Sequence, residues 1–197
     1  QNIFNPNTPQ DVSSKIVIGL ERISEVFKLL LWKKAKHIGL SPIQIQNLTF
    51  VAFHKSELCN VSHLAKEFNI TKPTISDAIK VLDKKGMIFK DYSPTDQRSY
   101  TIQLTVSGKE IVTETNDFAA PLKAQVDSLD AAQLDDFFNT LSSLIYKLNQ
   151  SEVLSVQRTC YACKFYQKNN DTSYCNLLQA TLKNEDVRLD CPEFIEK

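Results

Sequence analysis

Apolar residues recur every three or four positions along most of the chain, which is the period of an amphipathic helix. The first such stretch runs from Asp11 to about His37, and its apolar positions are Ile16, Leu20, Ile23, Phe27, Leu30 and Leu31. Gly39 follows directly and supplies a residue that readily ends a helix. The pattern therefore predicts one long amphipathic helix at the start of the chain.

Three shorter helices are expected between residues 41 and 85. Ser41 followed by Pro42 is a typical helix start, and VSHLAKEF at 61–68 suits a short second helix. The third runs from about Lys72 to Lys85, with Thr71 or Lys72 as its cap and Gly86 as its stop. Its apolar positions share one face: Ile75, Ala78, Ile79 and Leu82.

The period then shortens from that of a helix to that of a strand. MIFKDY at 87–92 alternates loosely, and SYTIQLTV at 99–106 alternates clearly, with SPTDQR as a polar link between them. We expect Tyr100, Ile102, Leu104 and Val106 to lie on one side of the second strand. The two segments predict an antiparallel hairpin with a polar tip.

Helical spacing returns after the hairpin. Ser107 and Gly108 are expected to open a helix that runs to about Asp127, and Asp130 is expected to cap a last helix over 131–150. That helix has apolar residues at Leu134, Phe137, Phe138, Leu141, Leu144, Ile145 and Leu148. This is more apolar surface than a lone surface helix needs, so the pattern favours self-association.

The order of helix, short helix, helix and hairpin between residues 41 and 106 is typical of a winged helix-turn-helix. With the apolar face of the third helix buried, its polar face can reach a DNA major groove, while an arginine at the wing tip can enter the minor groove. Asp96 is placed to hold that arginine. The predicted DNA contacts are Thr71, Lys72, Thr74, Ser76, Asp77, Lys80, Lys90 and Arg98.

Charge changes this picture modestly. The 197 residues have no net charge, but residues 1–40 and 41–109 each carry +3, residues 110–150 carry −5 and residues 151–197 carry −1. A basic front and an acidic later segment fit a chain that presents one face to a polyanion. No apolar run approaches the roughly 18 residues of a membrane span, and the start shows no signal-peptide pattern. We expect a cytoplasmic protein without a membrane partner.

An enzyme is not expected. The chain has four glycines and no glycine-rich phosphate loop, and no nucleophilic triad or carboxylate pair stands at a telling spacing. His54, Cys59 and His63 suggest a metal cluster, but they span a helix end, a loop and a new helix without a fourth ligand. We expect Cys59 to be a buried small hydrophobe instead.

The segment LAKEFNITKPTISDAIKVLDKKGMIFKDYSPTDQRSYTIQLTVSGKEIV resembles bacterial MarR-type transcriptional regulators. The resemblance rests on Leu82 with the Lys85-Gly86 stop, on Asp96-x-Arg98, and on Leu104-Thr105-x-x-Gly108. It implies a homodimer that binds double-stranded DNA at a pseudo-palindromic operator, most often as a repressor. It also implies that the helices within 1–40 and 107–150 form the dimerisation domain.

A small aromatic or anionic effector is also common among the proteins that this chain resembles. Phe27, Trp32 and Phe53 are candidates to line its pocket. Aromatic residues on apolar helix faces are more often core residues, and we favour that interpretation.

The last segment carries four closely spaced cysteines, Cys160, Cys163, Cys175 and Cys191, in the order C-x2-C-x11-C-x15-C. Four thiolates suit one tetrahedral zinc ion or a 4Fe-4S cluster; disulfides or free thiols are the remaining alternatives. The segment has few apolar residues, and a metal would stabilise it directly. We expect zinc, with the cluster as alternative.

The resulting fold class is mainly α: a winged helix-turn-helix with a helical dimerisation domain and a small C-terminal module held by a four-cysteine metal site. We divide the chain into a dimerisation helix (1–40), the winged helix (41–106), further dimerisation helices (107–150) and the cysteine tail (151–197). Three hypotheses follow: a regulator with a structural metal site, a redox- or cluster-sensing regulator using the same cysteines, and a protein-docking module that reads no DNA.

Overall fold

The computed structural model describes residues 2–92, 100–169 and 172–197. The wing-tip residues Asp96 and Arg98 lie outside these ranges, so their predicted roles stay predictions. Among the described residues, no helix combines the length and the apolar character that crossing a membrane requires.

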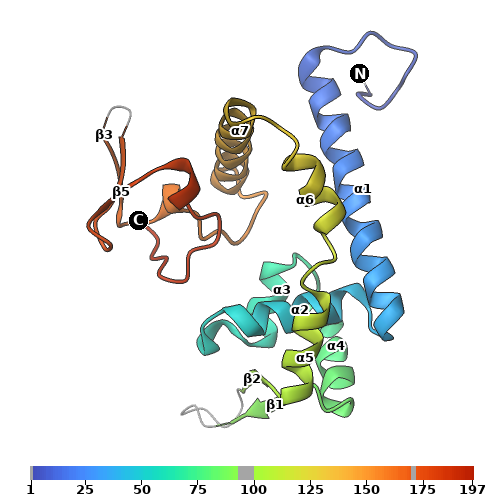
Figure 1. Ribbon diagram of the computed structural model, residues 1–197. Helices are drawn as coiled ribbons and strands as arrows, with labels where there is room; N and C mark the ends of the chain where they lie inside the picture. The colour runs from blue at the N-terminus through green and yellow to red at the C-terminus, as the bar shows by residue number, and fades with distance from the viewer. Residues whose placement is uncertain (1, 93–99, 170–171) are drawn as a thin grey trace.

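Helix α1 (Val12–Ile38) forms as predicted and stands away from the rest of the chain along most of its length (Figure 1). The Asp11 carboxylate accepts a hydrogen bond from the Ser14 N–H at its start, and Gly39 ends it with a φ of 70°. Its buried residues, Leu31 and Ala35, lie in the last two turns. Most of its apolar face is therefore uncovered in the single chain.

The next elements build a compact lobe, at the bottom of Figure 1. They are α2 (Pro42–Phe53), the 3-10 turn η1 (Ser56–Leu58), α3 (Val61–Glu67), α4 (Lys72–Lys84), β1 (Ile88–Asp91), β2 (Thr101–Leu104) and α5 (Val106–Thr115). The strands pair antiparallel, with Ile88 opposite Leu104. The core includes Ile45, Leu48, Leu64, Ile75, Ile79, Leu82 and Ile102. This confirms the predicted winged-helix order.

Two boundaries differ from the prediction. Strand β2 ends at Leu104, and Val106 begins α5 with 75% of its surface exposed, so it does not share the buried side of the strand. Thr105 caps the helix, which therefore begins before the predicted Ser107 and Gly108. The Thr105 hydroxyl donates to the Gly86 carbonyl and accepts from the Gly108 N–H, which fixes the chain reversal at this point.

The helix predicted to run from residue 107 to about 127 is two helices. Helix α5 ends at Thr115, and α6 (Ala120–Val126) begins after four intervening residues. Pro121 lies in the first turn of α6. Proline lacks an N–H and clashes with the preceding turn, so it is tolerated at a helix start and not in a helix interior.

Helix α7 (Ala131–Gln150) agrees with the prediction. Asp130 caps it in a reciprocal capping box with Gln133. The described tail residues, 151–169 and 172–197, then fold back along α7, as the orange and red ribbon of Figure 1 shows.

The tail contains short elements that the sequence pattern did not indicate, because strands of three or four residues give little periodicity. They are η2 (Cys160–Ala162), β3 (Tyr166–Asn169), β4 (Thr172–Cys175), β5 (Ala180–Leu182) and η3 (Asn184–Asp186). The strands form one antiparallel sheet in the order β3-β4-β5.

Candidate functional sites

Helix α4 presents a polar face to solvent because its apolar face is fully committed to the core. Thr71 caps it, with its hydroxyl accepting from the Thr74 N–H. The predicted inward residues are all buried: Ile75, Ala78, Ile79 and Leu82. This confirms the orientation expected of the second helix in a helix-turn-helix.

The outward side of α4 carries small and charged groups. Lys72, Thr74, Asp77 and Lys80 are exposed, and Ser76 is half-buried. Asp77 and Lys80 form an ion pair of 2.9 Å, with 74% and 66% of their side chains exposed. An exposed pair of this kind contributes little to stability, and its lysine is available to a phosphate.

Lys90, on β1, is less available than the sequence suggested. Its ammonium lies 2.6 Å from the Asp83 carboxylate and 5.5 Å from the centre of the Tyr100 ring. The hydrogen bond to Asp83 raises the pKa of Lys90. Its charge is therefore engaged inside the lobe, where it ties the hairpin to the end of α4.

The backbone of the tail brings the four cysteines together from distant positions. Cys160 and Cys163 flank the η2 turn, in which the Cys163 N–H donates to the Cys160 carbonyl. A parallel bridge between Arg158 and Asp190 places Cys191 beside Cys160. Cys175, the last residue of β4, pairs with Tyr166 of β3 and so lies near Cys163.

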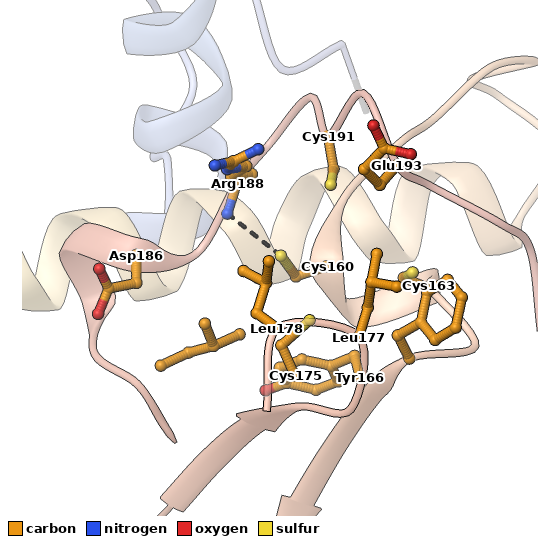
Figure 2. Close-up of a pocket in the computed structure, with 12 residues that line it drawn as sticks. Cys160, Cys163, Tyr166, Cys175, Leu177, Leu178, Asp186, Arg188, Cys191 and Glu193 are labelled. Carbon is orange, nitrogen blue, oxygen red and sulfur yellow. Dashed lines mark hydrogen bonds between the residues drawn. The ribbon is translucent and has the colours of Figure 1, made fainter. Parts of the chain in front are cut away.

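All four sulfur atoms surround one small cavity of about 40 Å³ (Figure 2). The Arg188 N–H points at the Cys160 sulfur from 3.3 Å. Burial raises the pKa of Cys160, this hydrogen bond lowers it, and the other three cysteines raise it further. Each cysteine thus lies within electrostatic range of Cys160, and none of the five in the chain forms a disulfide.

The four tail cysteines nevertheless do not lie at metal-coordinating distances from a common point. Among the described residues, no group of three or more His, Cys, Asp or Glu side chains is placed so that it could hold a metal ion. The cavity exceeds the roughly 10–15 Å³ that one water-sized particle needs. The cysteines have the chemistry and the common cavity for an ion, and they would have to move inward to reach Zn–S distances of about 2.3 Å.

The other cysteine and the histidines near it have separate roles. Burial raises the pKa of Cys59 to about 11, so its thiol stays protonated, and the prediction of a buried Cys59 is confirmed. His54 contacts the Phe50 carbonyl through Nδ1 and Asp190 through Nε2, each at 2.8 Å. His54 therefore links the lobe to the tail. The residues around His54 in the sequence give no sign of this contact.

The aromatic residues considered for an effector pocket are not core residues in the single chain. Trp32 is 54% and Phe53 69% exposed, and Phe27 touches Phe118 edge-on while remaining 39% exposed. The expectation that they belong to the core was wrong: Phe27 and Trp32 lie on the largely uncovered helix α1, and Phe53 is the last residue of α2. Phe53 borders a surface groove shared by α2 and α5.

The winged-helix part of the chain matches a known family. Residues 38–99 match the model of the MarR family. An uncharacterised HTH-type transcriptional regulator of Bacillus subtilis, YdgJ, is 30% identical over 91 residues, which are 46% of this chain and 54% of the relative. The chain thus matches about half the length of that curated relative.

Solved structures show the same fold. A DNA complex of MepR from S. aureus has a TM-score of 0.59 at 22% identity, covering 67% of this chain and 97% of MepR. CouR from Rhodococcus jostii RHA1, bound to p-coumaroyl-CoA, has a TM-score of 0.57 at 18% identity, covering 69% and 95%. The chain has a mainly helical, MarR-like winged-helix fold, and about a third of it has no counterpart in these proteins.

Proposed function

We propose that this chain is a MarR-type transcriptional regulator that binds double-stranded DNA as a homodimer, acting as a repressor at a pseudo-palindromic operator. The observation that carries the proposal is the polarity of α4, whose apolar face is buried and whose opposite face offers exposed hydroxyl, carboxylate and ammonium groups. The family match over residues 38–99 supports it, as does a relative of the same fold in complex with DNA.

Dimerisation is supported by the uncovered stripe on α1. Ile16, Leu20, Ile23 and Phe27 follow one another at helical spacing, and each exposes more than a third of its surface. A monomer in water would leave this stripe solvated at a considerable free-energy cost. A second copy of the chain covers it and sets two α4 helices apart by a fixed distance.

The direct test is selection of bound sequences from a random duplex pool. We expect an inverted repeat whose half-sites lie about 10–10.5 base pairs apart, or a multiple of this. Failure to enrich any motif, together with normal folding, would favour the protein-docking alternative.

On the selected site, replacement of Lys80 by alanine should weaken binding and reduce the slope of log K against log salt by about one, because one phosphate contact is lost. Lys123→Ala is the matched control. Lys123 also pairs with an aspartate one turn away, at 2.6 Å, but on α6. Equal effects of the two substitutions on affinity would contradict the assigned surface. Arg98→Ala at the wing should behave as Lys80→Ala does.

We also propose that Cys160, Cys163, Cys175 and Cys191 bind one zinc ion that stabilises the tail, with a 4Fe-4S cluster as the alternative. The shared cavity and the N–H aimed at the Cys160 sulfur support this proposal. Protein purified without oxygen should contain about one zinc per chain and lose it in Cys163→Ser, with Cys59→Ser as the control that retains it. A brown, iron-containing protein would establish the cluster instead, and absence of metal would refute both.

A further inference from the structure

Arg158, two residues before the first tail cysteine, joins the tail to the winged-helix lobe. Its guanidinium makes two parallel hydrogen bonds of 2.9 Å to the Glu67 carboxylate at the end of α3. The same group binds Asp190, immediately before Cys191, and lies 5.4 Å from the centre of the Phe50 ring in α2. Only 10% of the Arg158 side chain is exposed, so this is a largely desolvated, bidentate ion pair of the strong kind.

Three further contacts join the tail to the lobe. His54, at the end of α2, binds Asp190 while its ring stacks on Phe50 at 3.8 Å. Lys55 pairs with Glu193 at 3.1 Å. The Ser155 hydroxyl donates to the Lys66 carbonyl in α3. We call the contacts of Arg158, Asp190 and Glu193 with His54, Lys55 and Glu67 the tail–lobe seam.

The other side of the tail packs on α7. The Asn184 amide donates to Asp135 at 3.1 Å, and the Gln157 amide donates to Asn149 at 2.6 Å. The ring of Tyr161 lies 6.5 Å from that of Tyr146. The tail therefore touches both α7, which belongs to the proposed dimerisation helices, and the lobe proposed to read DNA, and it spans between them in Figure 1. We call these dimerisation helices the stalk.

The backbone that arranges the cysteines also arranges the seam. Arg158 and Asp190 are bridge partners, and the Cys191 N–H donates to the Arg158 carbonyl at 3.0 Å. The Cys160 N–H in turn donates to the Arg188 carbonyl at 3.0 Å. An ion that ties Cys160 to Cys191 therefore also fixes the separation of Arg158 and Asp190, the two residues that grip Glu67 and His54.

We propose that the tail is a metal-dependent strut: the ion held by the four cysteines keeps the tail–lobe seam closed, which holds the lobe at a set angle to the stalk and so controls operator affinity. This inference rests on the proposed function, because it requires both the ion and the operator. Loss of the ion frees the Arg158 and Asp190 segments to separate. The lobe then samples more orientations, and the fraction of dimers with both α4 helices correctly spaced falls.

The first measurement needs no DNA. Amide hydrogen exchange of the full-length chain is compared with zinc bound and after chelation under reducing conditions. We expect exchange to accelerate at residues 61–67 and 155–159 after chelation, because the seam opens, and to stay unchanged in α4. Unchanged exchange across the seam would overturn the proposal. Acceleration in a protein that selects no operator would support closure of the tail–lobe seam by the ion, and it would refute both the DNA-binding function and the control of operator affinity.

The second measurement is a cycle of operator affinities on the selected site. Chelation should weaken the wild-type chain about tenfold, within the usual range of coupling between sites. Glu67→Gln, which keeps the shape of the side chain but removes its charge, should weaken the zinc-loaded chain by a similar factor and respond little to chelation. Glu57→Gln, on an exposed carboxylate of η1 outside the seam, should behave as wild type.

Two outcomes of the cycle overturn the strut. One is an operator affinity that chelation leaves unchanged or strengthens in the wild-type chain. The other is a Glu67→Gln chain that loses the same factor on chelation as the wild type, since independent effects multiply and coupled effects do not. A chain that binds no ion at all refutes the metal site and the strut together.

Discussion

Ile23→Glu is expected to convert the proposed dimer to a monomer and to lower operator affinity by at least about a hundredfold. Ile23 lies in the middle of the exposed stripe of α1 and is 50% exposed in the single chain. A carboxylate there would be buried without a partner in the dimer, at a cost of several kcal/mol per ion. Two copies of it face the same interface by symmetry.

The loss of DNA binding follows from the loss of linkage between the two lobes. A monomer binds one half-site, whereas a dimer binds the second half-site at a high effective concentration, which commonly adds a factor of 10²–10⁴. Light scattering gives the mass, and titration of the selected operator gives the affinity.

Ile23→Leu is the control, since it keeps an apolar side chain of equal volume. It should remain dimeric and bind as the wild type does. Circular dichroism should show that the glutamate variant retains its helices. A glutamate variant that stays dimeric would place the interface on another surface of the chain.

Gly108→Ala is expected to destabilise the lobe by about 3 kcal/mol, at the upper end of ordinary overpacking. A Cβ built on Gly108 would lie 2.0 Å from the Met87 carbonyl oxygen, which belongs to the backbone and cannot swing aside. That oxygen also accepts the Thr105 N–H at 3.1 Å, so moving it breaks the junction between the hairpin and α5.

Thermal unfolding should register this change as a fall in Tm of about 10 °C for a chain of this size. Gly19→Ala is the matched control, because apart from the adjoining backbone of α1 itself no atom lies within 4 Å of a Cβ at that position. Alanine is favoured over glycine there by up to about 1 kcal/mol, so Tm should hold or rise. A Gly108→Ala chain as stable as wild type would show that the close approach to Met87 relaxes freely.

Gly108 shows that a sequence motif can be recognised without knowledge of the contact that requires it. The sequence run Leu104-Thr105-x-x-Gly108 contributes to the resemblance with MarR-type regulators, whereas the sequence pattern predicts a strand through Val106 and a helix start at Ser107 and Gly108. The structure shows that Thr105 caps the helix and that Gly108 is required by a contact with Met87, 21 positions earlier in the sequence. The spacing of residues along the sequence does not indicate that Gly108 lies against the Met87 carbonyl.

The cysteine site shows the same limit. The spacing of the four cysteines indicated a common site, and the cavity that they line agrees with this. Arg158, Asp190 and Glu67 were not singled out, although they connect the tail to the lobe. A charged residue beside a cysteine looks like an ordinary surface residue in sequence, and its partner here is 91 positions away.

The sequence alone determined the features that depend on neighbours within about one helical turn. The caps at Asp11, Ser41 and Asp130 and the buried face of α4 follow from short-range hydrogen bonding and from the helical period. Only the tertiary structure decided the engagement of Lys90 by Asp83 and the docking of the tail across α7, α2 and α3. These depend on which distant groups meet, and burial strengthens an ion pair such as Arg158–Glu67 only after the fold has excluded water from it.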